Sequence, residues 1–188
     1  LQQLLDIYQQ EKEWSRAIAV AEKLSGRSGR DRRAEVAQFH CELAEETAAR
    51  GDTTGALKLL KQALAEDRNC ARASLLEGKL LLRSGNPKGA IRALRRVEQQ
   101  DPALLPEVLE LLQACYATLG RQDDMTDFLR ELLDRHGGIS AMLVLAEQLT
   151  RRNGERAAIE LITDFLRRRP SVRGMSRLIQ LKTSADQD

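Results

Sequence analysis

The chain has 188 residues, its 30 Lys and Arg against 28 Asp and Glu leave a net charge of +2, and 42% of it is hydrophobic. A charge so near zero argues against a long basic surface for nucleic acid or an anionic membrane, and no apolar run approaches the length of a membrane span. Only 3% of the residues are aromatic, which is typical of an all-α protein whose core is packed by Leu and Ala.

Apolar residues recur at helical spacing in five pairs of segments, followed by one single segment. In chain order we expect helices at 1–10 and 14–24, 31–50 and 53–67, two within 71–102, then 103–120 and 122–135, 140–152 and 154–169, and finally 172–182. A loop over 26–30 separates the first pair from the second, and the tail at 183–188 is expected to fray.

A single period runs through these pairs. The same residue type recurs at a spacing of 34 residues in four cases: Gly51 and Gly85, Ala56 and Ala90, Leu60 and Leu94, and Asp67 and Asp101. Two periods forward, Ala90, Leu94 and Pro102 correspond to Ala158, Ile162 and Pro170. The period is about 34 residues, which is that of the tetratricopeptide repeat. We therefore predict an all-α, right-handed superhelix (α-solenoid) forming one domain over 1–188, with repeats at about 1–30, 31–70, 71–104, 105–138 and 139–171 and a terminal helix at 172–183.

Small residues and helix caps are predicted to define each pair. Gly78 against Ala90, like Ala44 against Ala56, would let two helices approach closely. The glycines that stand where left-handed C-terminal caps are expected are Gly51, Gly85 and Gly120. Asn86 followed by Pro87 predicts a capped helix start.

No group of side chains predicts catalysis or metal binding, so we expect neither an enzyme nor a cofactor in this chain. His40 and Cys41 are adjacent, so on a helix they point about 100° apart and cannot act together as base and nucleophile. We expect Cys41 to pack as a small hydrophobe and His40 to be partly exposed.

The cysteines Cys41, Cys70 and Cys115 lack a CxxC motif, which favours a reducing compartment over a disulfide framework or a zinc site. The basic clusters at 27–33 and 167–169 lack interleaved aromatic residues, so we expect no nucleic-acid partner.

The functional surface expected from this fold is its concave face, lined by the first helix of each pair. The protein-binding residues predicted there are Gln38, Glu45, Arg72, Leu75, Lys79, Arg83, Glu110, Gln113, Glu147 and Arg151. Arg72, Lys79 and Arg83 share one helical face and would form a cationic strip for acidic side chains or a C-terminal carboxylate. The alternative is that these charges form an ordinary solvated helix face.

Beyond the general repeat pattern, four stretches of the sequence resemble one particular protein family. They are LQQLLDIYQQEKEWSRAIAVAEKL at 1–24, EVAQFHCELA at 35–44, the segment 67–72, and FLRRRPSVRG at 165–174. In the same order, and with the same loop after the first pair, they resemble the cytoplasmic repeat domain of the lipopolysaccharide assembly protein B family. Because the chain starts at Leu1 within an amphipathic pattern, we interpret it as a fragment of a longer protein.

The resemblance implies an adaptor on the cytoplasmic side of the inner membrane of Gram-negative bacteria. Such a protein brings the deacetylase that commits precursor to lipid A synthesis, LpxC, to a membrane protease of the FtsH type, and an inner-membrane lipopolysaccharide sensor antagonises it. An N-terminal membrane anchor and a C-terminal rubredoxin-like domain holding zinc or iron are expected outside this fragment.

Two other interpretations stay open. One is a generic co-chaperone-like module that binds short acidic peptide tails, and the other is an enzyme or metalloprotein. Which face binds which partner is not fixed by the sequence, and a homodimer is left open.

Overall fold

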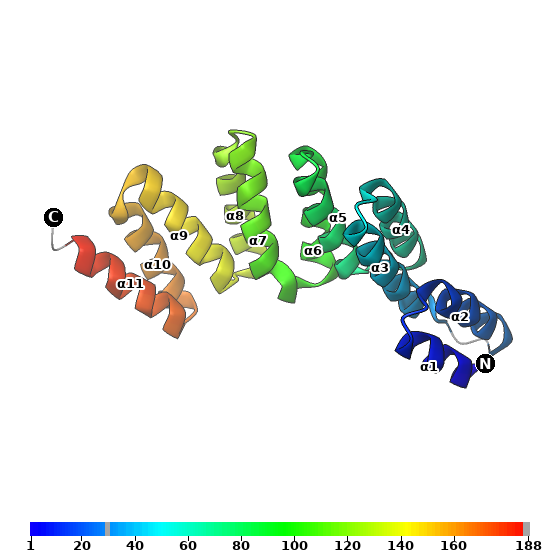
Figure 1. The fold of residues 1–188 in the computed structure, drawn as a ribbon. Helices are drawn as coiled ribbons and strands as arrows, with labels where there is room; N and C mark the ends of the chain where they lie inside the picture. The colour runs from blue at the N-terminus through cyan, green and yellow to red at the C-terminus, as the bar shows by residue number, and fades with distance from the viewer. Residues whose placement is uncertain (29–30, 186–188) are drawn as a thin grey trace. The chain divides into compact units, whose positions relative to one another are not determined.

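The computed structural model describes residues 1–28 and 31–185, and over these residues the chain forms eleven α-helices, one short 3₁₀ helix and no strand (Figure 1). The helices are α1 (Gln2–Gln10), α2 (Trp14–Ser28), α3 (Arg33–Ala49), α4 (Thr53–Glu66), α5 (Ala71–Arg83), α6 (Pro87–Gln100), α7 (Leu105–Thr118), α8 (Gln122–His136), α9 (Ile139–Asn153), α10 (Glu155–Arg168) and α11 (Val172–Ala185). The 3₁₀ helix Pro102–Leu104 connects α6 to α7. The predicted all-α class is confirmed.

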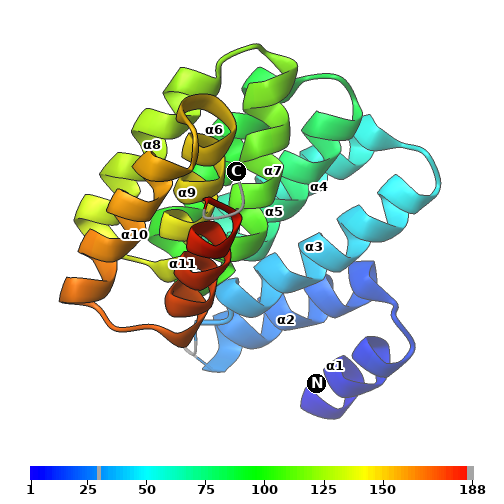
Figure 2. The ribbon, with the colours of Figure 1, turned by 90° about the vertical axis from the view of Figure 1, so that its left-hand side faces the viewer.

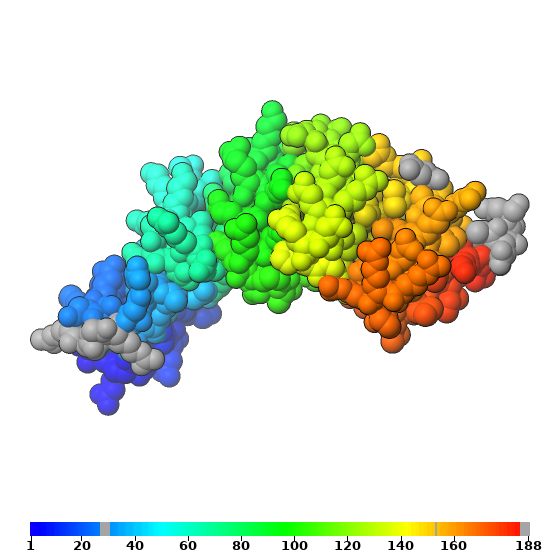
Figure 3. Space-filling view, turned by 180° about the vertical axis from the view of Figure 1, so that it is seen from behind, coloured from blue at the N-terminus to red at the C-terminus, as the bar shows by residue number. Residues whose placement is uncertain are grey.

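The chain divides into two compact units, Leu1–Cys115 and Tyr116–Asp188, and the division falls inside α7. In the first unit α3 packs on α4 and α5 on α6, and α5 also contacts α3 and α4 of the preceding pair (Figure 2). In the space-filling view neighbouring pairs of this unit, coloured from blue to green, lie in contact (Figure 3). In the second unit α9 packs on α10, and α11 contacts both. This stacking of antiparallel pairs is the arrangement predicted from the period.

Two parts of the prediction need correction. The tail expected to fray from residue 183 is helical as far as Ala185, because α11 continues to that residue, and residues 186–188 lie outside the described residues. The loop expected over 26–30 is helical at its start, because α2 continues to Ser28. The remainder of that loop, residues 29–30, lies outside the described residues.

Caps recur at the same interval as the core residues. The side chains of Asp52 and Asn86, one period apart, accept hydrogen bonds from the backbone N–H groups of Gly55 and Gly89 at 2.8 and 2.9 Å. Asp67 accepts from the N–H of Asn69 in the same way, at 2.9 Å, and its counterpart one period later accepts from Ala103 at 3.0 Å. The sequence repeat is therefore also a repeat of local hydrogen bonds that start helices and turns.

The predicted glycine caps are confirmed. Gly51, Gly85 and Gly120 have φ angles of +88°, +74° and +64°, a left-handed conformation that glycine adopts without the steric cost of a Cβ atom. Each follows the last turn of a helix, so the chain reverses there and the next helix returns alongside.

The small-residue contact differs in detail from the prediction. A Cβ atom added at Gly78 would lie 2.5 Å from the side chain of Leu94, so the residue pressed against this glycine is Leu94, one turn beyond the expected Ala90. Leu94 and Ala90 are both fully buried. The absence of a side chain at Gly78 thus makes room for a leucine, and the leucine fills the space between α5 and α6.

The core consists of the periodic small and aliphatic residues. In the first unit one cluster is built around Ala44, Ala56 and Leu60, and a second around Leu5, Ala17 and Phe39. In the second unit Ala158 and Ile162, which the period predicted, belong to a third cluster. The predicted core positions on both sides of the division are therefore fully buried.

Candidate functional site

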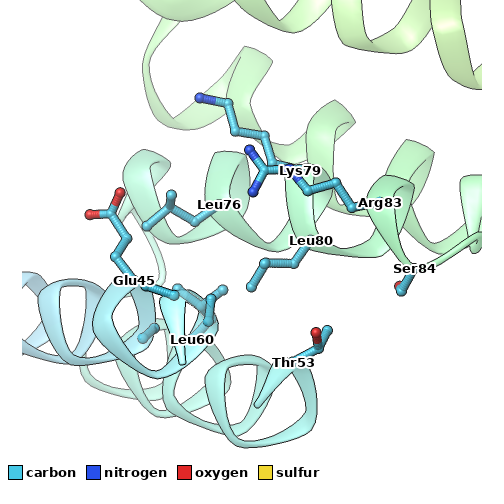
Figure 4. A pocket seen from close by; sticks show the side chains of 11 residues that line it. Glu45, Thr53, Leu60, Leu76, Lys79, Leu80, Arg83 and Ser84 are labelled. Atoms are coloured by element: carbon cyan, nitrogen blue, oxygen red, sulfur yellow. The ribbon is translucent and has the colours of Figure 1, made fainter. Parts of the chain in front are cut away.

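A groove of about 380 Å³ lies between α3, α4 and α5 in the first unit (Figure 4). The residues that line it are Ala44, Glu45, Ala48, Ala49, Thr53, Leu60, Leu76, Lys79, Leu80, Arg83 and Ser84. Three of them, Glu45, Lys79 and Arg83, belong to the concave face predicted from the sequence.

The floor of the groove is apolar because of helical spacing. Ala44 and Ala48 lie one turn apart on α3, and Leu76 and Leu80 lie one turn apart on α5, so each helix presents one apolar face. The small alanine side chains leave space beside α3, and Leu80 points toward Leu60 across this space (Figure 4). Leu76 and Leu80 pack against the core cluster built around Ala44, Ala56 and Leu60. Both leucines are only partly buried, so their side chains leave apolar surface exposed to a ligand.

The rim carries charge. Glu45 extends from α3, and Lys79 and Arg83 extend from one side of α5, also one turn apart (Figure 4). Thr53 and Ser84 add hydroxyl groups near the ends of the helices. An apolar floor with a few polar groups at its edge is the usual composition of a site that takes up an apolar side chain and orients it by its polar neighbours.

Two of the three cations in the predicted strip are already engaged. Arg72 donates from Nη1 to Oε1 of Glu42 at 2.6 Å and from Nη2 to the carboxylate of Glu45. Partial burial lowers the pKa of Arg72, but the hydrogen bonds to these two carboxylates outweigh it and raise the pKa. Nζ of Lys79 lies 2.6 Å from Oε1 of Glu107 on α7. These pairs link neighbouring helical pairs to each other.

Arg83 differs from both. It is exposed, and among the described residues no carboxylate lies within ion-pair distance of it. Of the predicted cationic strip, Arg83 is the guanidinium that can bind an external anion without first breaking an internal pair.

The other predicted site residues are dispersed. Leu75 is 7% exposed and so offers little surface, and the exposed Gln38 donates its amide N–H to the sulfur of Cys70 at 3.6 Å. Glu110 is exposed and Gln113 partly exposed on α7, and neither lines the groove. In the second unit Arg151 donates to Glu147 on the same helix at 2.6 Å.

Sequence reasoning missed the leucines of the groove floor. Leu76 and Leu80 were not among the predicted site residues, although their spacing of four places them together on the helix that carries Lys79 and Arg83. Glu42 and Glu107, the internal partners of the cations, had no signal, because each belongs to a different helical pair from its partner and lies far from it in sequence.

The residues considered for chemistry lie in packed or helix-end positions. Cys41 is fully buried and His40 half-buried, as predicted. Burial lowers the pKa of His40. His136 is the last residue of α8, and its carbonyl accepts a hydrogen bond from Arg169 at 3.1 Å. Within 1–28 and 31–185 no three His, Cys, Asp or Glu side chains converge as metal ligands would, and no helix combines the length and apolar character needed to cross a bilayer.

Comparison with known proteins agrees with this architecture. The tetratricopeptide repeat family matches residues 48–115, which include every residue lining the groove except Ala44 and Glu45. Lipopolysaccharide assembly protein B of Escherichia coli K12 is 41% identical over 180 residues, which are 95% of this chain and 46% of that protein. The chain is a relative of lipopolysaccharide assembly protein B. The protein of that name from Haemophilus influenzae is 31% identical over all 188 residues, which are 47% of that protein. The chain therefore spans about half the length of the relatives it matches.

Solved structures support the fold alone. A crystal structure of MamA aligns with a TM-score of 0.51 at 16% identity, covering 87% of this chain and 93% of that one. The MamA RS-1 ArsTM double mutant aligns with a TM-score of 0.53, also at 16% identity, over 98% of this chain and 97% of that one. The chain shares with these MamA structures a fold of stacked helices.

Proposed function

We propose that the chain is a non-catalytic interaction scaffold that acts in the control of lipopolysaccharide synthesis. The relatives carry the name of lipopolysaccharide assembly, and a solenoid of helical pairs is a fold that presents extended binding surfaces. The groove between α3, α4 and α5 is the proposed contact for a partner protein. The observation that supports it most directly is an apolar floor next to Arg83, a guanidinium without an internal carboxylate partner among the described residues.

The proposed mechanism is effective concentration. In the full-length protein, anchored at the cytoplasmic side of the inner membrane, the scaffold would hold the lipid A deacetylase close to an FtsH-type protease. When both proteins are bound to the same scaffold, their encounter is intramolecular and therefore frequent. The scaffold itself makes and breaks no covalent bond. An inner-membrane lipopolysaccharide sensor would then act by competing for the scaffold.

The rival proposal is a module for short acidic tails. Such modules hold a carboxylate with several free cations, and here Arg72 and Lys79 are already paired with Glu42, Glu45 and Glu107. A tail would have to displace these carboxylates, which costs part of its binding energy. The internal pairing therefore favours the scaffold over the tail binder.

The experiment is co-purification of deacetylase and protease with the full-length protein carrying Arg83→Glu and Leu80→Ala. The matched control is Arg92→Glu, an exposed arginine on α6 that does not line the groove. We expect the groove variant to lose at least one of the two partners and to lengthen the half-life of the deacetylase in cells, while the control behaves as wild type. Retention of both partners with an unchanged half-life would remove the groove from the proposal.

A further inference from the structure

Two cysteines that lie far apart in sequence meet in the first unit. Cys41 lies in the middle of α3 and Cys70 directly precedes α5, and their sulfur atoms are 3.8 Å apart. Both residues are buried, with 0% and 2% of their surfaces exposed. The proposed binding role uses neither thiol.

The two thiols have different surroundings. Cys70 stands at the N-terminus of α5, where the backbone N–H groups and the helix dipole favour a negative charge. The amide of Gln38 donates to its sulfur at 3.6 Å, and Arg72 follows two residues later. Both cysteines belong to one cluster of alanines and leucines, but Cys41 lies in the middle of α3, away from any helix end, so its surroundings disfavour a charge.

The pKa values follow this asymmetry. Donation from the Cys41 thiol lowers the pKa of Cys70 to about 7; burial opposes this shift, and the nearby N–H of Ala73 adds to it. The same hydrogen bond, together with burial, raises the pKa of Cys41. Cys70 is thus the thiol that loses its proton more readily, and Cys41 keeps its proton beside it.

The pair is close to the surface. Gln38, whose amide contacts the Cys70 sulfur, is itself an exposed residue of α3. Rotation of the Gln38 side chain would remove one group that covers the Cys70 sulfur, and this is the route we expect a molecule as small as a peroxide to take. A bulky reagent would need a larger opening of the helices.

We propose that Cys41 and Cys70 form a redox-sensitive dithiol that hydrogen peroxide converts to a disulfide and that a thiol reductant restores. The Cys70 thiolate attacks one peroxide oxygen, the O–O bond breaks, and the leaving hydroxide takes up a proton to become water. Cys70 is then a sulfenic acid. The Cys41 sulfur attacks the Cys70 sulfur, the S–O bond breaks, and hydroxide leaves with the Cys41 proton as a second water. Two thiols and one peroxide thus give one disulfide and two waters.

Closure would pull together two helices that also wall the groove. A disulfide bond is about 2.05 Å long, so the sulfur atoms must approach from 3.8 Å by side-chain rotation or by a shift of α5 against α3. Glu45 of α3 and Lys79 of α5 line the groove on these same helices. The dithiol chemistry itself does not depend on the proposed function, and its test needs no partner protein.

The test is peptide mapping of the folded chain after exposure to hydrogen peroxide and blocking of remaining thiols. Trypsin releases Cys41 within residues 34–50, Cys70 within 69–72 and Cys115 within 97–121. We expect a disulfide-linked pair of the peptides 34–50 and 69–72 that disappears on treatment with dithiothreitol. Cys115→Ser is the matched control and should leave the link unchanged.

Single variants test the order of steps. In Cys41→Ser the sulfenic acid should persist on Cys70 and be trapped by dimedone, whereas Cys70→Ser should give neither the link nor trapping at Cys41. Circular dichroism verifies that each variant is folded. The proposal is overturned if the 34–50 to 69–72 link is absent from the folded wild-type chain, or if it forms only in urea.

Discussion

The ammonium group of Lys79 lies 2.6 Å from a carboxylate oxygen of Glu107, and this pair connects α5 to α7 within the first unit. The sequence offered Lys79 as a free cation on a binding face, but the folded chain uses it to join consecutive helical pairs. Both side chains are partly exposed, at 32% and 47%, so the pair contributes below about 1 kcal/mol to stability. Its main effect is on which charges stay available at the groove.

The first prediction concerns this pair. Glu107→Ala frees Lys79, so we expect an acidic peptide to bind the variant several-fold more tightly than the wild type. Arg83→Ala should weaken binding of the same peptide more than Lys79→Ala does, because the guanidinium of Arg83 is not already held by an internal carboxylate of the described residues. Fluorescence anisotropy with a labelled acidic peptide measures both. An equal loss for Arg83→Ala and Lys79→Ala would contradict this ranking.

The second prediction concerns packing between α5 and α6. Gly78→Ala would place a Cβ atom 2.5 Å from the buried side chain of Leu94, and such overpacking typically costs about 1–3 kcal/mol. The gain in helix propensity, about 1 kcal/mol, offsets part of this cost. We expect a lower midpoint of urea unfolding.

Gly26→Ala is the matched control for Gly78→Ala. Gly26 is also a helix residue, but a Cβ atom there meets nothing within 4 Å. Only the propensity gain remains, so this variant should be as stable as the wild type or up to about 1 kcal/mol more stable. Destabilisation by both substitutions would show that the contact with Leu94 is not the cause.

The third prediction concerns the recurring caps. Asn86→Ala removes the oxygen that accepts from Gly89 N–H at the start of α6, and loss of such a cap costs about 1 kcal/mol. Asn86→Asp keeps the acceptor and should retain most of the stability, as Asp52 does at the equivalent position of α4. Thermal unfolding followed by circular dichroism compares the three proteins. Equal destabilisation by both variants would contradict the capping role.

The fourth prediction is the pH dependence of Cys70. Its pKa of about 7 in the folded chain lies below the ordinary value of 9.0, because Cys41 donates to it and Ala73 and Arg72 favour the thiolate, while burial and Asp67 oppose. At pH 7 a larger fraction of Cys70 is therefore thiolate than of an ordinary thiol. The rate of reaction with a small thiosulfonate should therefore level off above about pH 8 in the folded chain, and should keep rising to higher pH in urea.

Cys41→Ala is the companion variant for that measurement. Removing the donor should move the Cys70 titration toward its ordinary pKa, so the rate near pH 7 should fall. A profile identical to that of the wild type would show that the contact between the two sulfurs does not set the reactivity.

Much of the fold could be predicted because it is local and repeated. The glycines at 51, 85 and 120 and the cap at Asn86 act within a few residues of chain, so their sequence neighbours are enough to indicate their roles. The sequence pattern predicted Ala90 as the contact of Gly78, whereas the structure places Leu94, one turn further along α6, against that glycine. The repeat period does not indicate this difference, because the position of one helix along its partner depends on side-chain packing. The division of the chain inside α7 carried no signal in composition or linker length.

The site was less predictable for a physical reason. A helix face can be assigned from spacing alone, which placed Glu45, Lys79 and Arg83 on one surface, and all three line the groove. Whether a charge on that face is free depends on what the neighbouring pair brings opposite it. Arg72 meets Glu42 of the preceding helical pair, and Lys79 meets Glu107 of the following one, so only the assembled structure separates these two cations from Arg83.

The central claim is that the groove between α3, α4 and α5 binds a partner protein through Arg83 and the leucines beside it. Its most direct test is the equilibrium affinity of the purified deacetylase for the full-length protein, compared between wild type, Arg83→Glu and Arg92→Glu. We predict that Arg83→Glu weakens the affinity about tenfold or more, because it places a carboxylate where the partner's anion would bind, while Arg92→Glu leaves it unchanged. Equal affinities for all three proteins, or an equal loss in both variants, would contradict the account.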